Sequence, residues 1–151
     1  MNNTLIISLF LAAAFILPNL CHALPAPCTQ EQLLESSDFA IEGTVTKVEC
    51  EAPYESQECS AKDDAKSFVP ELLAKCTAYV KVSENIKGQY GKGDEAVIPY
   101  LQLVQNCENG THIIPGSPVK NFVPNSLIKY YNSEQCKYWN YLQISAPPSN
   151  N

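Results

Sequence analysis

The stretch Ala74-Lys75-Cys76-Thr77-Ala78-Tyr79-Val80-Lys81-Val82 decides the fold that this sequence predicts. Small or apolar residues occupy every second position, and Lys, Thr and Tyr fill the positions between them. A period of two is typical of a β-strand with one buried face. Cys76 lies on the apolar face, which suits a buried disulfide. We therefore predict a strand here.

Other parts of the chain show similar strand patterns. Residues 39–50 alternate and are rich in β-branched side chains, and Gly43 within them indicates a bulge or bend. Residues 95–105 are mostly apolar, but Pro99 cannot donate a ladder hydrogen bond, which predicts an edge strand or a bulge. Shorter strands are expected at residues 119–123, 126–131 and 136–144.

Helical signals are few. Thr29 can cap a short helix, with Gln32 completing a capping box, and Pro70 suits the first position of a further helical turn. Residues 51–67 are polar and predict a long loop. Five or six short antiparallel strands with one or two short helices predict an all-β domain, a small Greek-key barrel or a sandwich.

The N-terminus resembles a secretory leader. Residues 5–17 are apolar except for Ser8, which is too short for a comfortable membrane span of roughly 20 residues. Small residues before the expected cleavage point predict cleavage after Ala23. We expect a signal peptide at 1–23, one domain at 24–145 and a disordered tail at 146–151. The mature protein would be secreted or periplasmic, without a stable membrane anchor.

Six of the seven cysteines follow this leader: Cys28, Cys50, Cys59, Cys76, Cys107 and Cys136. An even set behind a leader predicts disulfides, because oxidising compartments let thiols stay paired. No pair has zinc-knuckle spacing, so we expect no metal and no cofactor. Six cysteines allow 15 pairings. Cys50 and Cys59 bracket one short loop, which favours their pairing.

Charge excludes one class of function. The chain has a net charge of −6, and its basic residues are all lysine. Arginine is the usual fork for phosphates and base edges. We therefore expect neither nucleic-acid binding nor attachment to an anionic membrane.

One segment resembles a known family. Asp38-Phe39-Ala40-Ile41-Glu42-Gly43-Thr44-Val45 is similar to the opening strand of netrin-like domains, the group that contains the tissue inhibitors of metalloproteinases. Val80-Lys81-Val82, followed by Ile86-Lys87-Gly88 and Gly93-Asp94, resembles the second strand and hairpin of bacterial members. The resemblance implies a five-stranded Greek-key OB-type barrel. It also implies a Cys28–Cys107 disulfide, which leaves Cys76–Cys136 by elimination.

The family's inhibitory chemistry is not expected here. In the metalloproteinase inhibitors, the amine of an N-terminal cysteine binds the protease zinc. The predicted mature chain begins at Leu24, and Cys28 lies four residues inside.

Candidate functional residues fall into three groups. If the protein were a histidine-dependent hydrolase, His112 would have to be its catalytic histidine. A solvent-exposed histidine without a catalytic role is the simpler interpretation. Tyr138, Trp139 and Tyr141 would lie on a C-terminal strand, with Trp139 and Tyr141 on one face, as core or as a binding platform. The acidic residues Glu51, Glu55 and Glu58 are expected in a solvated loop that a basic partner could use.

We therefore predict a secreted, monomeric binding module that binds or inhibits another protein, and not an enzyme. The alternatives are a small hydrolase that uses His112 and a carbohydrate or surface-matrix binder that uses the Trp139 face.

Overall fold

The computed structural model describes residues 26–57, 59–62, 67–112 and 118–145. The predicted leader (1–23) and tail (146–151) lie outside these ranges. One helix, α1 (Gln30–Ser36), precedes eight strands within the described ranges. The strands are β1 (Ala40–Cys50), β2 (Tyr54–Glu55), β3 (Cys59–Ala61), β4 (Leu72–Lys87), β5 (Glu95–Gln105), β6 (Gly110–His112), β7 (Leu127–Tyr131) and β8 (Tyr141–Ser145). The prediction of a mainly β, antiparallel domain is confirmed.

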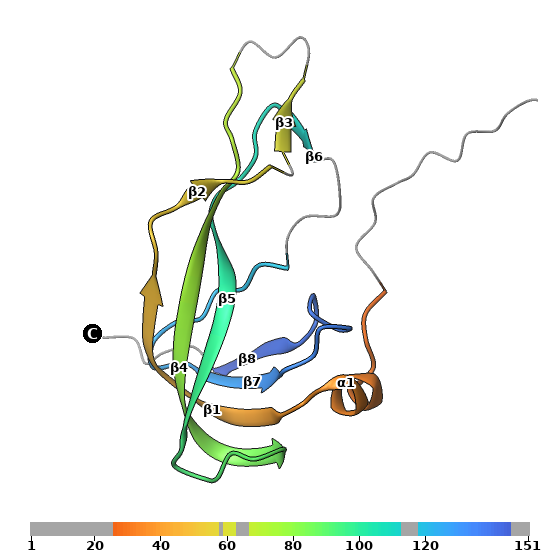
Figure 1. The fold of residues 1–151 in the computed structure, drawn as a ribbon, viewed down its shortest axis with the longest axis vertical. Coiled ribbons are helices and arrows are strands. Elements are labelled where there is room, and N and C mark those ends of the chain that lie inside the picture. Colours follow the sequence, from red (N-terminus) through yellow and green to blue (C-terminus); the bar gives the residue numbers. More distant parts are fainter. Residues whose placement is uncertain (1–25, 58, 63–66, 113–117, 146–151) are drawn as a thin grey trace, which may run out of the picture.

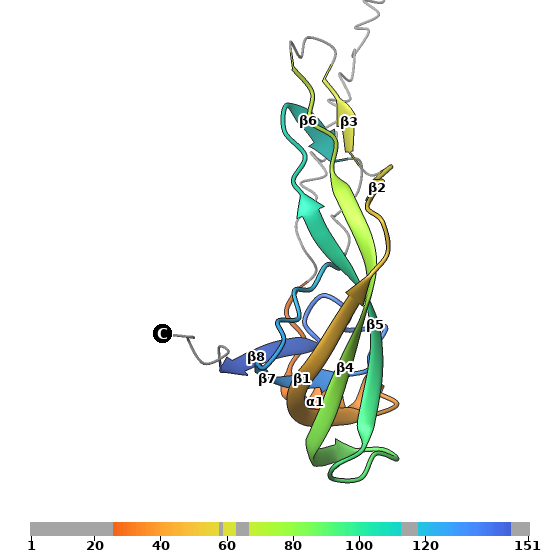
Figure 2. The same ribbon diagram turned by 90° about the vertical axis from the view of Figure 1, so that its left-hand side faces the viewer.

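The main sheet joins β5, β4, β1, β7 and β8 in that order, with β2 paired to the first residues of β4. β3 and β6 form a separate two-stranded sheet. β4 and β5 extend past β7 and β8, and the β3–β6 sheet lies at the far end of this extension (Figures 1 and 2). β5 and β8 are the edges of the main sheet and do not pair with each other in the described ranges.

Gly43 sits where β1 must bend, as predicted. The register between β1 and β4 shifts at Glu42/Gly43 and again between Val45 and Lys47. A Cβ atom on Gly43 would lie 2.5 Å from the carbonyl oxygen of Lys81, so only glycine fits without a shift of the backbone. The bulges let the first half of β1 pair with both β4 and β7, while its second half pairs with β4 alone.

Two apolar clusters lie on opposite faces of the sheet, because successive residues of a strand point to opposite sides. The main core contains Ile41, Val80, Ile98 and Ile128, all fully buried. The alternation predicted for residues 74–82 is confirmed, since all its apolar positions are buried. A smaller cluster packs α1 against the sheet and contains Leu33, Ala40, Tyr131 and Cys136.

The helix begins as its sequence predicts. The hydroxyl of Thr29 accepts from the backbone N–H of Gln32, at 3.2 Å. The Gln32 side chain accepts in return from the backbone N–H of Thr29, at 2.8 Å. This capping box satisfies donors that the helix itself leaves free.

Three expectations of secondary structure were wrong. Pro70 starts no helical turn, because β4 begins at Leu72 after a bridge between Val69 and Glu108. Residues 119–123 form no strand, and within the described ranges their backbone pairs with β5 only through a parallel bridge from Val119 to Leu101. The last strand begins at Tyr141, since residues 134–139 form turns.

All six cysteines form disulfides, but the expected pairings were wrong. The bonds are Cys28–Cys136, Cys50–Cys76 and Cys59–Cys107, with Cα–Cα distances of 6.0, 4.0 and 6.2 Å. Residues 51–67 are not a simple loop: they carry β2 and then β3, which moves Cys59 to the second sheet, away from Cys50. Cys50 and Cys76 lie directly opposite each other in the β1–β4 ladder. Three intramolecular disulfides indicate an oxidising, extracellular or periplasmic environment.

Candidate functional site

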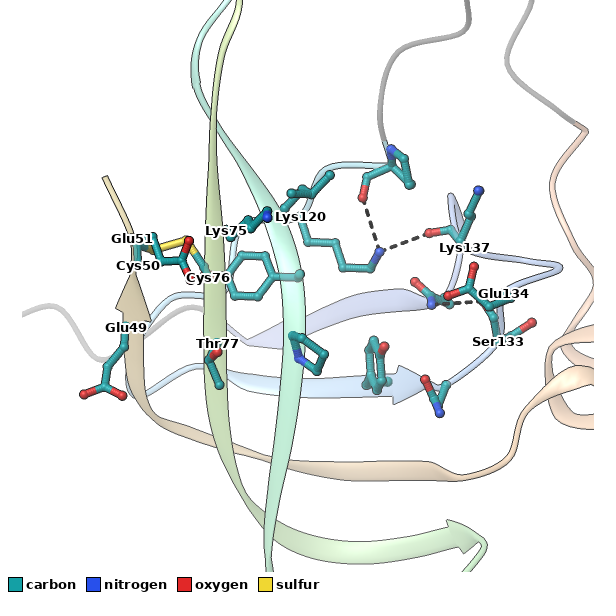
Figure 3. A pocket seen from close by; sticks show the side chains of 17 residues that line it. Glu49, Cys50, Glu51, Lys75, Cys76, Thr77, Lys120, Ser133, Glu134 and Lys137 are labelled. Atoms are coloured by element: carbon teal, nitrogen blue, oxygen red, sulfur yellow. Dashed lines mark hydrogen bonds between the residues drawn. A yellow bond between two sulfur atoms is a disulfide. The ribbon is translucent and has the colours of Figure 1, made fainter. Parts of the chain in front are cut away.

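A pocket of about 800 Å³, lined by both charged and apolar residues, lies between the middle of β4 and β5 and the turns that precede β8. We call it the Lys120 pocket. One wall contains the Cys50–Cys76 disulfide, Tyr100 and Leu101. The other contains Ser133, Glu134, Lys137 and Asn140. Figure 3 shows Lys120 reaching across the space between these walls.

Lys120 joins the two walls, because its ammonium group reaches the turn wall and its backbone N–H reaches β5. Its Nζ donates to the backbone oxygen of Lys137 at 3.1 Å and to that of Pro118 at 3.4 Å. Its backbone N–H donates to Leu101 O on β5, at 2.8 Å. Burial lowers the pKa of the Lys120 amine, and the Glu134 carboxylate partly offsets this effect. The pocket therefore contains a partly desolvated cation held in a fixed place.

Two buried tyrosines lie against the same space. Tyr100 and Tyr130 are 8% and 5% exposed. Tyr100 donates its hydroxyl to Gln102 Oε1 at 3.2 Å, and burial raises its pKa. Burial, with a contribution from Glu134, raises the pKa of Tyr130 to about 12. Both phenols therefore remain neutral around pH 7, where they can donate hydrogen bonds.

We expect stability to fall as the pH rises from about 10 to about 12, partly through Tyr130. In this window the unfolded chain releases the phenol proton, while the folded protein retains it. The contribution is fully present below pH 10 and is lost through the folded pKa of about 12. Between these two pH values, the free energy of unfolding of Tyr130→Phe should fall by about 2–3 kcal/mol less than that of the wild-type protein. Urea unfolding at both ends of the window measures it, with exposed Tyr54→Phe as control. An unchanged pH dependence in Tyr130→Phe would contradict the assignment.

Asn140 holds the turn wall in place through hydrogen bonds. It is 4% exposed, and its Nδ2 donates to the Ser133 backbone oxygen at 3.3 Å. Its backbone oxygen accepts from the N–H of Tyr131 at 2.9 Å, and Ser133 Oγ accepts from the N–H of Cys136 at 3.0 Å. Within the described part of the chain, Asn140 Oδ1 is buried and has no hydrogen-bond partner. A buried acceptor without a partner is costly, and such a group calls for an explanation.

The predicted aromatic surface is only partly assembled. Tyr138 and Trp139 lie in the turn before β8, not on a strand. Trp139 is 36% exposed and lines a groove of about 590 Å³ with Tyr138, Leu142 and Pro27. Tyr141 lines the same groove, but its ring also packs on Phe122, with ring centroids 4.6 Å apart, and its hydroxyl donates to Asn121 O. Trp139 is thus the more exposed ring of the predicted pair, and Tyr141 is half-buried.

The predicted acidic surface is separate from the aromatic one. Glu51 follows β1 and lines the Lys120 pocket, while Glu55 lies in β2; both are exposed. Glu58 lies outside the described residues. Glu49, nearby on β1, already has partners. Its carboxylate pairs with the Lys47 ammonium group at 2.5 Å and accepts a hydrogen bond from the Tyr79 hydroxyl at 2.8 Å. The Lys47 interaction lowers the pKa of Glu49.

The backbone of His112 pairs with Cys59 in the β3–β6 sheet. Its side chain lies outside the described part of the structure, so the hydrolase alternative stays a prediction. Among the described residues, no group of three or more His, Cys, Asp or Glu side chains could hold a metal ion. No helix in those ranges is long and apolar enough to cross a membrane.

The sequence patterns did not single out Lys120 or Asn140. Lys120 lies two residues after Pro118, in a segment that mixes polar and apolar residues without a regular pattern. Asn140 lies between two aromatic residues. Neither neighbourhood carries a motif. Both residues become part of a site only because the chain brings residues 118–123 and 133–140 together.

The chain matches no protein-family model, no curated protein and no solved structure. Its geometry defines a disulfide-linked, mainly β protein whose described surface carries the Lys120 pocket and a partly exposed aromatic groove.

Proposed function

We propose that this protein is a secreted binding module that binds or inhibits another protein. The observation that carries the proposal is the exposed apolar surface of β8. Trp139, Leu142 and Ile144 are 36%, 59% and 45% exposed. Leu142 and Ile144 share one face of the strand, because side chains two residues apart point the same way. Trp139 lines the same groove as Leu142.

An edge strand with apolar side chains is a suitable docking element. β8 pairs only with β7 in the described ranges, which leaves its outer backbone groups available. Such an edge can accept an extended segment of a partner as an additional strand. Tryptophan is enriched among the residues that dominate binding energy. The partner we propose is therefore a protein that presents an extended, apolar segment.

The proposed fold family is the netrin-like OB-type barrel. The strands β7, β1, β4 and β5 lie in the spatial order fourth, first, second, third, which is the order of a Greek key. A short capped helix precedes the first long strand. The unpaired edges of β5 and β8 and the Cys28–Cys136 bond depart from the expected barrel. A closed barrel would join β5 and β8 by ladder hydrogen bonds. In this proposal the segment 118–123 fills the seam between these two strands.

Secretion completes the proposal. Residues 1–23 would direct export and be cleaved after Ala23, and the three disulfides would then form outside the cytoplasm. A carbohydrate-binding role has narrower support, because only Trp139 of the predicted ring pair is exposed.

A capture experiment tests the protein-binding role. Immobilised mature protein, Trp139→Ala and the control Tyr54→Ala would be exposed to the native extracellular fluid, and the captured proteins identified. Tyr54 is a suitable control because it is an aromatic residue of similar exposure, on β2. We expect Trp139→Ala to weaken the partner's Kd at least about tenfold and Tyr54→Ala to leave it unchanged. A partner that binds both variants with the wild-type Kd would refute the proposed surface.

A further inference from the structure

We propose that the Lys120 pocket binds the free carboxyl end of a peptide. The pocket and the β8 surface face opposite sides of the sheet: Tyr130 lines the pocket, whereas its neighbours Lys129 and Tyr131 line the Trp139 groove. This inference therefore concerns a second site and does not depend on the partner of β8.

The cationic end of the pocket suits a carboxylate. An ammonium group has three donors, and two of those on Lys120 reach the carbonyls of Pro118 and Lys137. The third donor is available to a ligand, and hydrogen bonds between ionised groups are the stronger kind. Figure 3 shows Lys137 at the same end of the pocket and Glu51 at the opposite end, beside the disulfide.

The charge balance favours a single carboxylate over a phosphate-rich ligand. Three lysines line the pocket, at positions 75, 120 and 137, and three glutamates do so at 49, 51 and 134. The lining is therefore neutral in sum, and a polyanion would meet the glutamates as well as the lysines. A monoanion at Lys120 meets one nearby carboxylate, that of Glu134, and Lys137 at the same end of the pocket offsets its charge.

Asn140 supplies the complementary group. Its Oδ1 is buried and lacks a partner in the described structure, while its Nδ2 is already bonded to Ser133 O. The orientation of the amide is thus set, and the free position is an acceptor. The last residue of a peptide carries both a backbone N–H and the terminal carboxylate, so one ligand can serve both Asn140 and Lys120.

The size and apolar lining of the pocket suit the end of a peptide. Its volume of about 800 Å³ is within the range of small-ligand sites. Tyr100 and Tyr130 offer ring surface next to neutral hydroxyls, and Pro99 and Leu101 add apolar contacts from β5. An aromatic or aliphatic last residue could pack there.

A comparison of two peptides tests the proposal on the wild-type protein. N-acetyl-Ala-Ala-Phe with a free carboxylate and its C-terminal amide would be titrated into ¹⁵N-labelled mature protein. We expect the acid to bind with a Kd of about 1 mM or tighter and to shift the Asn140 side-chain amide signals, with the amide at least about tenfold weaker. No binding of the acid at about 10 mM, or equal binding of the two, would overturn the proposal.

A matched pair of variants tests the role of Lys120. Lys120→Met removes the charge and keeps most of the aliphatic stem; Lys92→Met makes the same change at an exposed position in the turn before β5. We expect at least about a tenfold loss of affinity for the acid in the first and none in the second. Unchanged affinity in a folded Lys120→Met protein refutes the assignment. If that variant does not fold, the comparison of acid and amide decides.

Two further titrations identify the source of the carboxylate and check that the two sites are independent. The first titration compares unacetylated Ala-Ala-Phe with the acetylated form. If the unacetylated peptide binds at least about tenfold tighter, the source is free peptides. If the two bind equally, the source is the carboxyl termini of proteins. Either result supports carboxylate recognition. Trp139→Ala should leave peptide affinity unchanged, and a parallel loss would overturn the separation of the two sites.

Discussion

Replacing both Cys28 and Cys136 with alanine should lower the free energy of unfolding by about 4–5 kcal/mol. The bond closes a loop with a sequence separation of 108 residues, and a crosslink across a longer loop restricts the unfolded chain more. Cys136 is 1% exposed and belongs to the cluster that packs α1 against the sheet, so the substitution also removes buried contacts. Urea unfolding of the mature protein measures the loss.

The Cys50→Ala/Cys76→Ala double variant is the matched control. Its bond spans 26 residues, which predicts a loss about 1 kcal/mol smaller. A larger loss in the control would contradict this ranking. Mass spectrometry of non-reduced proteolytic fragments checks the pairing itself, and a fragment that links Cys28 to Cys107 would contradict the Cys28–Cys136 bond.

Phe122→Ala should cost about 3–5 kcal/mol, the usual range for a buried phenylalanine. Phe122 is 3% exposed, and its ring centroid lies 4.6 Å from those of Tyr100 on β5 and Tyr141 on β8. It therefore links the two edges of the main sheet, which no ladder joins within the described ranges. Its removal leaves a cavity at this seam, which side chains on two separate strands cannot readily fill.

The control for Phe122 is Phe68→Ala. Phe68 is 37% exposed, and substitutions at such positions are usually within about 0.5 kcal/mol of neutral, or somewhat more for a large apolar side chain. Urea unfolding, followed by the fluorescence of Trp139, would compare the two. A loss below about 1 kcal/mol for Phe122→Ala would show that the segment 118–123 does not hold the seam.

Local patterns predicted the parts of the fold that local contacts determine. The alternation at residues 74–82, the span of β5 and the capping box at Thr29 each depend on residues close in sequence, and the structure contains all three. Gly43 was also predicted to mark a bend, because a missing side chain within a strand pattern is visible in the sequence.

The disulfide pairing depends on long-range folding. Cys50 and Cys59 are close in sequence, yet β2 and β3 carry Cys59 to a different sheet. The candidate site could not be predicted for the same reason, because it also depends on long-range folding. An exposed lysine and the partly buried Lys120 look alike in a sequence, and only the meeting of residues 118–123 with the turns before β8 distinguishes them.

The Cys28–Cys136 bond has a mechanical consequence. The strands β1 to β7 lie between these two cysteines in sequence and thus inside one covalent loop. Tension applied to residues 26 and 145 would pass through the sulfur–sulfur bond and bypass that loop. Only the residues after Cys136 could extend, so β8 would peel from β7 while the rest of the sheet remained under no pull. The surface proposed to hold a partner would thus be the first to respond to force.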